Sequence, residues 1–152
     1  MDKANCRHLL FYKTSDNAYA PVKASMCSAG YDLRASSDHI IYPIPNKNDP
    51  IPTNLKVIIP NGCYGRIASR SGLALKLLDV GGGVVDSDYR GEIFVIMYNY
   101  GDAPFVINKG DKIAQIICEK IENVELLEIT KNELDINNTE RGSKGFGSSG
   151  IK

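Results

Sequence analysis

Residues 79–93 read D-V-G-G-G-V-V-D-S-D-Y-R-G-E-I, and the rest of the chain is organised around this stretch. The glycines Gly81–Gly83 let the backbone approach a neighbour closely and permit positive φ angles. Two valines and Asp86 follow, then Tyr89, and the pair Arg90-Gly91 indicates a turn into the most apolar run of the chain. A glycine backbone, a carboxylate and an aromatic ring within so few residues predict a hairpin that forms one wall of a small-molecule pocket.

The overall composition is that of one globular domain. The chain has 152 residues, of which 43% are hydrophobic and 24% charged, values typical of a chain that buries a real core. Lys plus Arg and Asp plus Glu number 18 each, so no net field attracts nucleic acid or a membrane surface. An anionic ligand must therefore be bound by a local cluster of donors.

Cysteine spacing and hydropathy indicate an intracellular protein. The four cysteines are far apart in the chain and include no C-x-x-C pair: Cys6, Cys27, Cys63 and Cys118. This spacing argues against a zinc site and a disulfide framework. No apolar run approaches the roughly 20 residues that cross a bilayer, and the N-terminus does not resemble a secretory signal. We expect a soluble protein of the cytoplasm or nucleus that binds neither nucleic acid nor membrane.

Short apolar runs separated by turn residues predict roughly eight to ten β-strands outside one helical segment. The expected strands lie at 9–13, 29–35, 39–44, 55–59, 63–68, 92–100, 105–107 and 112–119, with a weaker one at 124–129. Residues 46–53, which contain two prolines, indicate a surface loop. Only residues 71–78 favour a helix, with Ser71 as its cap. The pattern predicts an all-β sandwich, jelly roll or distorted barrel with one short helix.

Two further segments carry candidate ligand groups. Residues 65–76 place Arg66, Arg70 and Ser71 at the start of the expected helix, where an anion is stabilised by free N–H groups and guanidinium charge. The alternative is a capped surface helix. Residues 141–150 read R-G-S-K-G-F-G-S-S-G; such a segment is either a flexible tail or a lid that closes over a phosphorylated, ring-bearing ligand.

Single residues in these patterns leave alternatives open. Asp86 is either a general base that polarises a water or a turn aspartate. Tyr89 either stacks on a ring or fills the core. Gln115 lies in an apolar strand and points either into a pocket or to solvent. His8 and His39 have no partner at metal-ligand spacing, and we interpret both as structural.

Five segments in order resemble the motifs of the homotrimeric dUTPase family. They are A-G-Y-D-L at 29–33, G-R-I-A-S-R-S-G-L-A at 65–74, G-V-V-D-S-D-Y-R-G at 83–91, G-D-K-I-A-Q at 110–115, and R-G-S-K-G-F-G-S-S-G at 141–150. Each motif alone is weak, but five in this order are highly specific. The sequence of residues 79–86 is most similar to that of dUTPases from eukaryotes and large DNA viruses.

The resemblance implies a distorted jelly-roll β-barrel that assembles as a homotrimer with shared active sites. It implies Mg²⁺-dependent hydrolysis of dUTP to dUMP and pyrophosphate. The barrel would span residues 1–136, and residues 137–152 would form a Gly/Ser-rich arm that closes over the site. Mg²⁺ would be held mainly by the triphosphate, since this ion prefers oxygen ligands and keeps several waters.

The resemblance also implies roles for single residues. Asp86 would activate the attacking water, and Asp32 would anchor Arg70 and contact the water shell of the metal at most. Uracil and deoxyribose would be bound by Gly83, Val84, Val85, Tyr89, Phe94 and Phe146. Phosphates would be bound by Arg70, Ser71, Gly72, Gln115, Arg141, Gly147, Ser148 and Ser149.

The sequence departs from the family pattern at a few positions, and three other interpretations remain. Ser69 stands where the family usually has proline, which predicts a looser turn before Arg70; Lys144 adds a cation, and Ser149 replaces a common threonine. A dCTP deaminase-like enzyme would need a glutamate, which residues 81–91 lack. A non-catalytic protein of the same fold, or a structural jelly roll, would not need the aromatic and cationic residues of the motifs.

Overall fold

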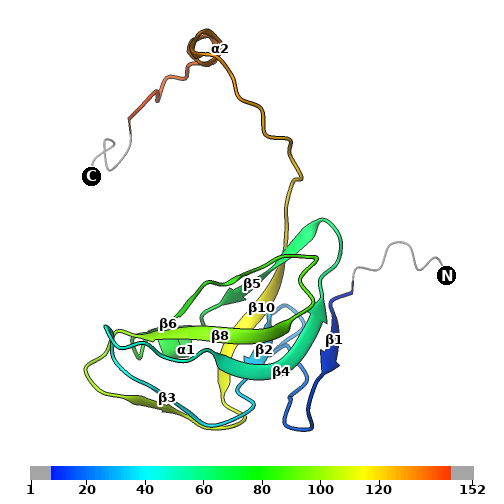
Figure 1. The fold of residues 1–152 in the computed structure, drawn as a ribbon, viewed down its shortest axis with the longest axis vertical. Coiled ribbons are helices and arrows are strands. Elements are labelled where there is room, and N and C mark those ends of the chain that lie inside the picture. The colour runs from blue at the N-terminus through cyan, green and yellow to red at the C-terminus, as the bar shows by residue number, and fades with distance from the viewer. Residues whose placement is uncertain (1–7, 145–152) are drawn as a thin grey trace, which may run out of the picture. The chain divides into compact units, whose positions relative to one another are not determined.

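A computed structural model of the chain describes residues 8–144. The chain divides by its contacts into two units, Met1–Glu122 and Asn123–Lys152. The first unit contains all the strands and the helix α1, and the second contains the helix α2 (Figure 1). This division comes earlier in the chain than the arm boundary expected after residue 136.

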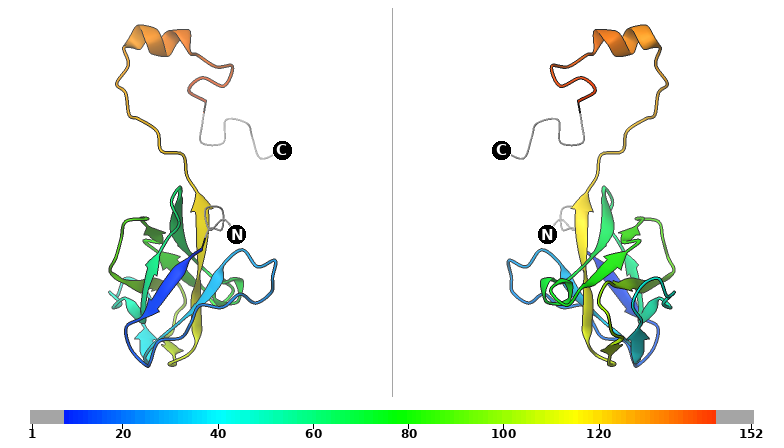
Figure 2. Two further views of the ribbon diagram at one scale, coloured as in Figure 1. Left: turned by 90° about the vertical axis from the view of Figure 1, so that its right-hand side faces the viewer. Right: turned by 90° about the vertical axis from the view of Figure 1, so that its left-hand side faces the viewer.

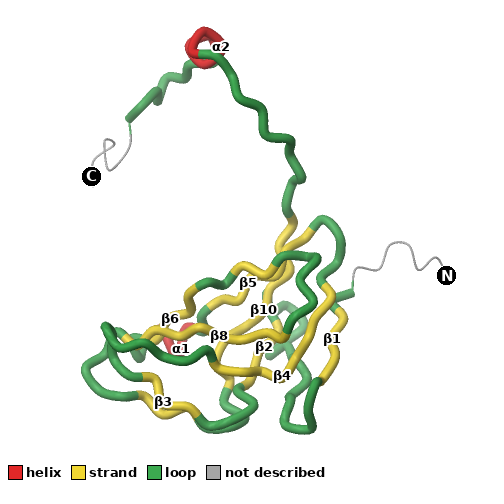
Figure 3. The backbone as a smooth tube through the Cα atoms, viewed as in Figure 1, coloured by secondary structure: helices red, strands yellow, loops and turns green. Residues whose placement is uncertain are grey.

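The first unit consists of two four-stranded sheets and one two-stranded sheet (Figure 3). The order in the first sheet is β1 (Leu10–Lys13), β4 (Ile51–Ile58), β8 (Glu92–Asn99) and β6 (Leu78–Gly81). The order in the second is β2 (Tyr31–Arg34), β10 (Lys112–Lys120), β5 (Cys63–Ala68) and β7 (Val84–Val85). The third sheet pairs β3 (His39–Ile41) with β9 (Phe105–Ile107). Each of these strand pairs is antiparallel.

The two larger sheets enclose one hydrophobic core, and the views in Figure 2 show their strands from both sides. Side chains in β4 and β8 alternate between buried and exposed, as expected for strands with one face against a core. The fully buried aliphatic side chains of the two sheets include Leu33, Ile51, Leu55, Ile93, Val95, Ile113 and Ile116. The predicted all-β jelly-roll fold is thus confirmed.

Two buried polar side chains connect parts of the barrel. The Thr53 hydroxyl donates to the carbonyl of Ile93 at 2.6 Å. The Asn99 amide donates to the carbonyls of Ile41 and Ala103 at 2.9 and 2.8 Å. Because both groups are satisfied, their burial does not carry the cost of an unpaired polar atom.

Strand β4 begins inside the segment that was predicted to be a loop. Pro52 lies in the strand opposite Phe94, although proline cannot donate to a ladder. The register between β4 and β8 shifts between Pro52 and Lys56, and Asn54 has a φ of 53° within this bulge. A bulge tolerates both features, and the core-facing alternation that begins at Ile51 outweighs the proline signal.

The predicted helix at residues 71–78 was too long. Helix α1 spans Ser71–Ala74, and Arg70 rather than Ser71 occupies its N-cap position, without a side-chain cap hydrogen bond. Leu77 adopts a φ of 61°, and Leu78 then begins β6 opposite Asn99. Burial of Leu78 in the sheet outweighs the helix propensity of the leucines, which is worth little in so short a segment.

The second unit has a helix where none was predicted. Residues 124–129 form no strand, and α2 spans Lys131–Ile136. Thr130 and Glu133 form a capping box at its start, and the T-x-x-E spacing was the sequence signal for it. Among the described residues, no helix has the length and apolar character needed to span a membrane.

Candidate active site

The hairpin that contains β7 lies against β5. Val84 and Val85 pair with Arg66 and Gly65, and the Ile67 N–H donates to the Gly83 carbonyl at 2.7 Å. A Cβ on Gly83 would lie 2.3 Å from the carbonyl oxygen of Ile67, so no side chain fits there. The close approach predicted for the glycines is therefore made to the neighbouring strand.

A pocket of about 260 Å³ collects most of the residues predicted to bind the nucleoside. Those residues are Val84, Val85, Tyr89 and Phe94, and the predicted catalytic base Asp86 lines the same pocket. The other lining residues are Pro50, Ile67, Gly82, Glu92, Ile93 and Ile96, so the walls are mainly apolar. Gly83 lines an adjacent hollow on the other side of the hairpin. A mainly apolar pocket with a few polar groups suits a flat heterocycle and its sugar.

The two carboxylates of the pocket have different surroundings. Glu92 accepts hydrogen bonds from the Asn54 N–H and the Thr14 hydroxyl, each at 3.2 Å. The Asp86 side chain is exposed, and the described residues give its carboxylate no hydrogen bond or ion pair. Asp86 is thus the carboxylate that is available to polarise a water molecule.

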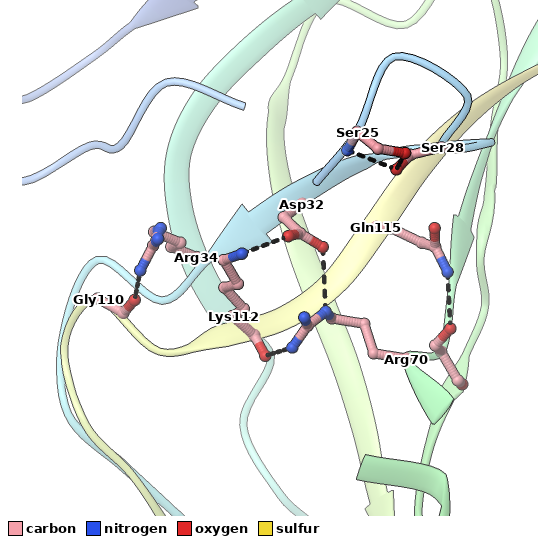
Figure 4. Close-up of polar contacts among 9 residues, drawn as sticks. Ser25, Ser28, Asp32, Arg34, Arg70, Gly110, Lys112 and Gln115 are labelled. Carbon is pink, nitrogen blue, oxygen red and sulfur yellow. Dashed lines mark hydrogen bonds and ion pairs between the residues drawn. The ribbon is translucent and has the colours of Figure 1, made fainter. Parts of the chain in front are cut away.

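Asp32 and Arg70 make the contact that the family resemblance implies. The Arg70 Nε donates to Asp32 Oδ1 at 3.0 Å, and its Nη1 donates to the carbonyl of Lys112 at 3.2 Å (Figure 4). The Lys112 Nζ lies 2.8 Å from Asp32 Oδ2, so each oxygen of this buried carboxylate faces a cation. Sequence reasoning did not give Lys112 a role, although this residue lies within the G-D-K-I-A-Q motif at 110–115.

Gln115 and Ser69 fix the turn that precedes Arg70. The Gln115 Nε2 donates to the carbonyl of Ser69 at 3.1 Å (Figure 4). The Ser69 hydroxyl contacts Asp79 and accepts from the Val80 N–H at 2.9 Å. The Ser69 hydroxyl thus makes contacts with Asp79 and Val80 that a proline could not make, and the looser turn expected from serine stays a prediction.

Arg66 does not join Arg70. Its Nε donates to Glu119 Oε1 at 2.6 Å, and the Tyr64 hydroxyl donates to Glu119 Oε2 at 2.6 Å. The Tyr64 hydroxyl and then Arg66 hold the pKa of the Glu119 carboxyl below its ordinary value. Arg66 is therefore occupied by an ion pair on the sheet surface.

The predicted phosphate-binding residues lie outside the pocket. Arg70 borders a hollow of about 390 Å³ together with Arg34 and Lys112. Gln115 borders a different hollow, of about 540 Å³. Ser71 and Gly72 are exposed at the start of α1. On one copy of the chain, the hollow with Arg70 shares no lining residue with the pocket of Asp86, whereas the hollow with Gln115 adjoins that pocket at Ile67 and Val84.

The predicted arm residues are described only in part. Arg141 belongs to the second unit, where its Nε donates to the carbonyl of Lys144 at 3.0 Å. Phe146, Gly147, Ser148 and Ser149 lie outside the described residues.

The side chains present fit a magnesium ion held mainly by its substrate. Among residues 8–144, no group of three or more His, Cys, Asp or Glu side chains is placed to hold a metal ion. Asp32, the predicted outer-shell group, has a cation on each of its carboxylate oxygens. A hard divalent cation with several retained waters suits this arrangement.

Comparison with known proteins agrees with this site. The dUTPase family model matches residues 16–150. The deoxyuridine 5'-triphosphate nucleotidohydrolase of Fowlpox virus is 52% identical over 142 residues, which cover 93% of this chain and 96% of the relative. The Mus musculus enzyme of the same name is 46% identical over 143 residues, covering 93% and 85%.

Solved structures give the same result. A Staphylococcus bacteriophage 80alpha dUTPase mutant with dUpNHpp superposes with a TM-score of 0.86 at 27% identity, covering 95% of this chain and 99% of that one. A mutant dUTPase from phage phi11 of S. aureus, described with a structural Mg(II) ion, has a TM-score of 0.75 at 26% identity, covering 83% and 99%. Because the family model spans most of the sequence and these relatives align over nearly its whole length, the chain belongs to the dUTPase family.

Proposed function

We propose that this protein hydrolyses dUTP to dUMP and pyrophosphate, which limits uracil incorporation into DNA and supplies dUMP for dTTP synthesis. The observation that carries the proposal is the pocket in which the unengaged Asp86 lies beside Tyr89 and the glycine hairpin. The names of the viral and mammalian relatives agree with it. A role in deoxynucleotide metabolism suits a cytoplasmic or nuclear location.

The hairpin would recognise the base through its backbone. β7 is the last strand of its sheet, so the side of Val84 and Val85 away from β5 can offer backbone donors and acceptors to a ligand. The uracil edge carries two carbonyls and one N–H, which such backbone groups can pair. Phe94 and Tyr89 would supply apolar contact to the base and the deoxyribose.

Asp86 would act as the general base. Its carboxylate takes a proton from a water molecule as the water oxygen attacks the α-phosphorus in line. The bond from that phosphorus to the bridging oxygen breaks, and pyrophosphate leaves. Positioning and charge stabilisation supply most of the rate enhancement in such a transfer.

Phosphate binding would fall to Arg70, Ser71, Gly72 and Gln115. The Asp32 carboxylate fixes one edge of the Arg70 guanidinium and leaves other N–H groups for phosphate oxygens. Mg²⁺, held mainly by the triphosphate, would neutralise part of the developing negative charge.

We also propose a homotrimer with shared active sites. The separation of the hollow with Arg70 from the pocket of Asp86 on one copy supports it. The second unit supports it as well, because Val124, Leu126 and Leu127 are 78–99% exposed, and such apolar surface favours association. Residues 137–152 would form the arm of the site: Arg141, Gly147, Ser148 and Ser149 would contact phosphates, and Phe146 would stack on uracil.

Deamination of dCTP is disfavoured because the glutamate that lines the pocket is already engaged in hydrogen bonds. Glu92 lines the pocket, but Asn54 and Thr14 occupy its carboxylate. The purified protein should therefore release pyrophosphate from dUTP with Mg²⁺, little from UTP, and no ammonia from dCTP. Ammonia from dCTP, or no turnover of dUTP, would contradict the proposed function.

Asp86→Asn should abolish turnover of dUTP, with a loss of at least about 100-fold in kcat, because the amide cannot accept the proton from water. Calorimetric titration with a non-hydrolysable dUTP analogue should show that binding is largely retained. Asp88→Asn is the matched control, since Asp88 is exposed and does not line the pocket. Full activity in Asp86→Asn would remove the proposed base.

Deletion of residues 140–152 should cripple turnover while the protein still assembles, because the arm acts on bound substrate. Pyrophosphate release and light scattering measure the two effects. Normal activity of the shortened chain would exclude the arm from the site.

A further inference from the structure

The aromatic ring of Tyr89 packs onto the backbone of Gly91. A Cβ on Gly91 would lie 2.2 Å from the Tyr89 hydroxyl oxygen and 2.4 Å from Cζ. The φ of Gly91 is outside the positive range in which glycine is favoured. The need for glycine at this position is therefore steric, and the atoms that need the space belong to Tyr89.

A hydrogen bond holds the same ring from its other end. The Tyr89 hydroxyl donates to the carbonyl of Glu92 at 3.1 Å. The Tyr89 residue is 45% exposed, so core packing does not fix its position. The backbone of Gly91 and Glu92 is what locates the ring at the edge of the pocket.

We propose that Gly91 and the Glu92 carbonyl are positioning elements that set the selectivity for deoxyribose over ribose by fixing the Tyr89 ring. This inference rests on the proposed function, in which Tyr89 contacts the deoxyribose. The resemblance to dUTPases implies that the ring lies where a 2′-hydroxyl would have to sit and so excludes ribonucleotides. Steric exclusion needs a wall that stays in van der Waals contact with the sugar, and a displacement of about 1 Å changes a site of this kind strongly. Restoring ordinary contact to a Cβ at position 91 requires a ring movement of about that size.

The test is the ratio of kcat/KM for dUTP to kcat/KM for UTP. Gly91→Ala should lower this ratio at least about tenfold, because the displaced ring no longer meets the 2′ position. In a Tyr89→Ala background the same substitution should change the ratio less than about twofold, since the two residues act as one unit. Asp88→Ala, in the same turn and outside the pocket lining, should leave the ratio unchanged.

Two outcomes would overturn the inference: an unchanged ratio in Gly91→Ala, or an equal fall with and without the tyrosine. If Gly91→Ala does not fold, Tyr89→Phe decides, because it keeps the glycine and removes only the bond to the Glu92 carbonyl. A fall of at least about threefold then supports the inference, and no fall overturns it. A wild-type protein that does not hydrolyse dUTP would instead refute the proposed function.

Discussion

Single residues of the hairpin are constrained by the backbone of neighbouring strands. Position 83 has no space for a side chain because the Ile67 carbonyl lies where a Cβ would be. The Gly83 carbonyl meanwhile accepts the Ile67 N–H. Through these two contacts, Gly83 joins the hairpin that carries Asp86 to β5, the strand that leads to Arg70.

Gly83→Ala should destabilise the protein by about 2 to 4 kcal/mol, because β7 must move away from β5 and the hydrogen bond to Ile67 is lost. Thermal unfolding should show a melting temperature several degrees lower. Gly72→Ala is the stability control, since a Cβ there meets nothing within 4 Å. Equal melting temperatures for the two variants would contradict the close contact.

Much of the hairpin could be predicted from residue types alone, whereas Lys112 could not. Asp86, Tyr89 and the valines lie close in sequence, so a short hairpin necessarily brings them together. Lys112 meets Asp32 only because β10 pairs with β2. Such a contact depends on the registry of distant strands, which local pattern does not determine.

Among the elements, helix α2 begins with a capping box that contains one charged side chain, Glu133. Glu133 accepts from the Thr130 N–H and from the Thr130 hydroxyl, each at 2.8 Å. These two hydrogen bonds, the backbone one first, hold the pKa of Glu133 below its ordinary value of 4.5. The Glu133 side chain therefore stabilises the first turn of the helix more strongly when it is ionised than when it is protonated.

The helicity of residues 131–136 should be constant above pH 4.5 and should fall as the pH drops through the lowered pKa of Glu133. The sign follows because the folded form favours the charged carboxylate, and protonation turns it into a weaker acceptor. Backbone carbon chemical shifts across this range measure the change. In Glu133→Gln the shifts should lose that pH dependence; a native helix insensitive to acid would contradict the role of the cap.

Prediction at the level of elements succeeded where alternation is strong and failed where tertiary contacts decide. Strands β5, β8 and β10 were predicted nearly at their bounds, because one face of each is buried. The helix at 71–78 was overextended, since pairing with β8 takes Leu78 into a strand. Residues 124–129 have strand-like composition but no partner strand among the described residues.

On the scale of the whole molecule, the proposed trimer would complete a site that each copy holds only in part. The pocket with Asp86 and the hollow with Arg70 are different surfaces of one chain. A symmetric oligomer can bring the pocket of one copy against the hollow of the next. Each active site of such an assembly would be formed by residues of two neighbouring chains.

Mixed assemblies test this arrangement. Asp86→Asn and Arg70→Ala chains, each inactive alone, should regain up to about a quarter of native activity when unfolded and refolded together, because some sites then combine two intact halves. Each variant carried singly through the same procedure is the control, and light scattering should give a trimer. If the mixture stays inactive, each site is built within one chain.

The contact between Gly83 and Ile67 also bears on resistance to inhibitors. A compound that binds the backbone edge of β7 makes no use of the valine side chains, so substitutions at Val84 or Val85 would weaken it little. A side chain at position 83 could obstruct the compound, but the Ile67 carbonyl excludes one. Resistance to such a compound through a side chain at position 83 would therefore cost the protein stability.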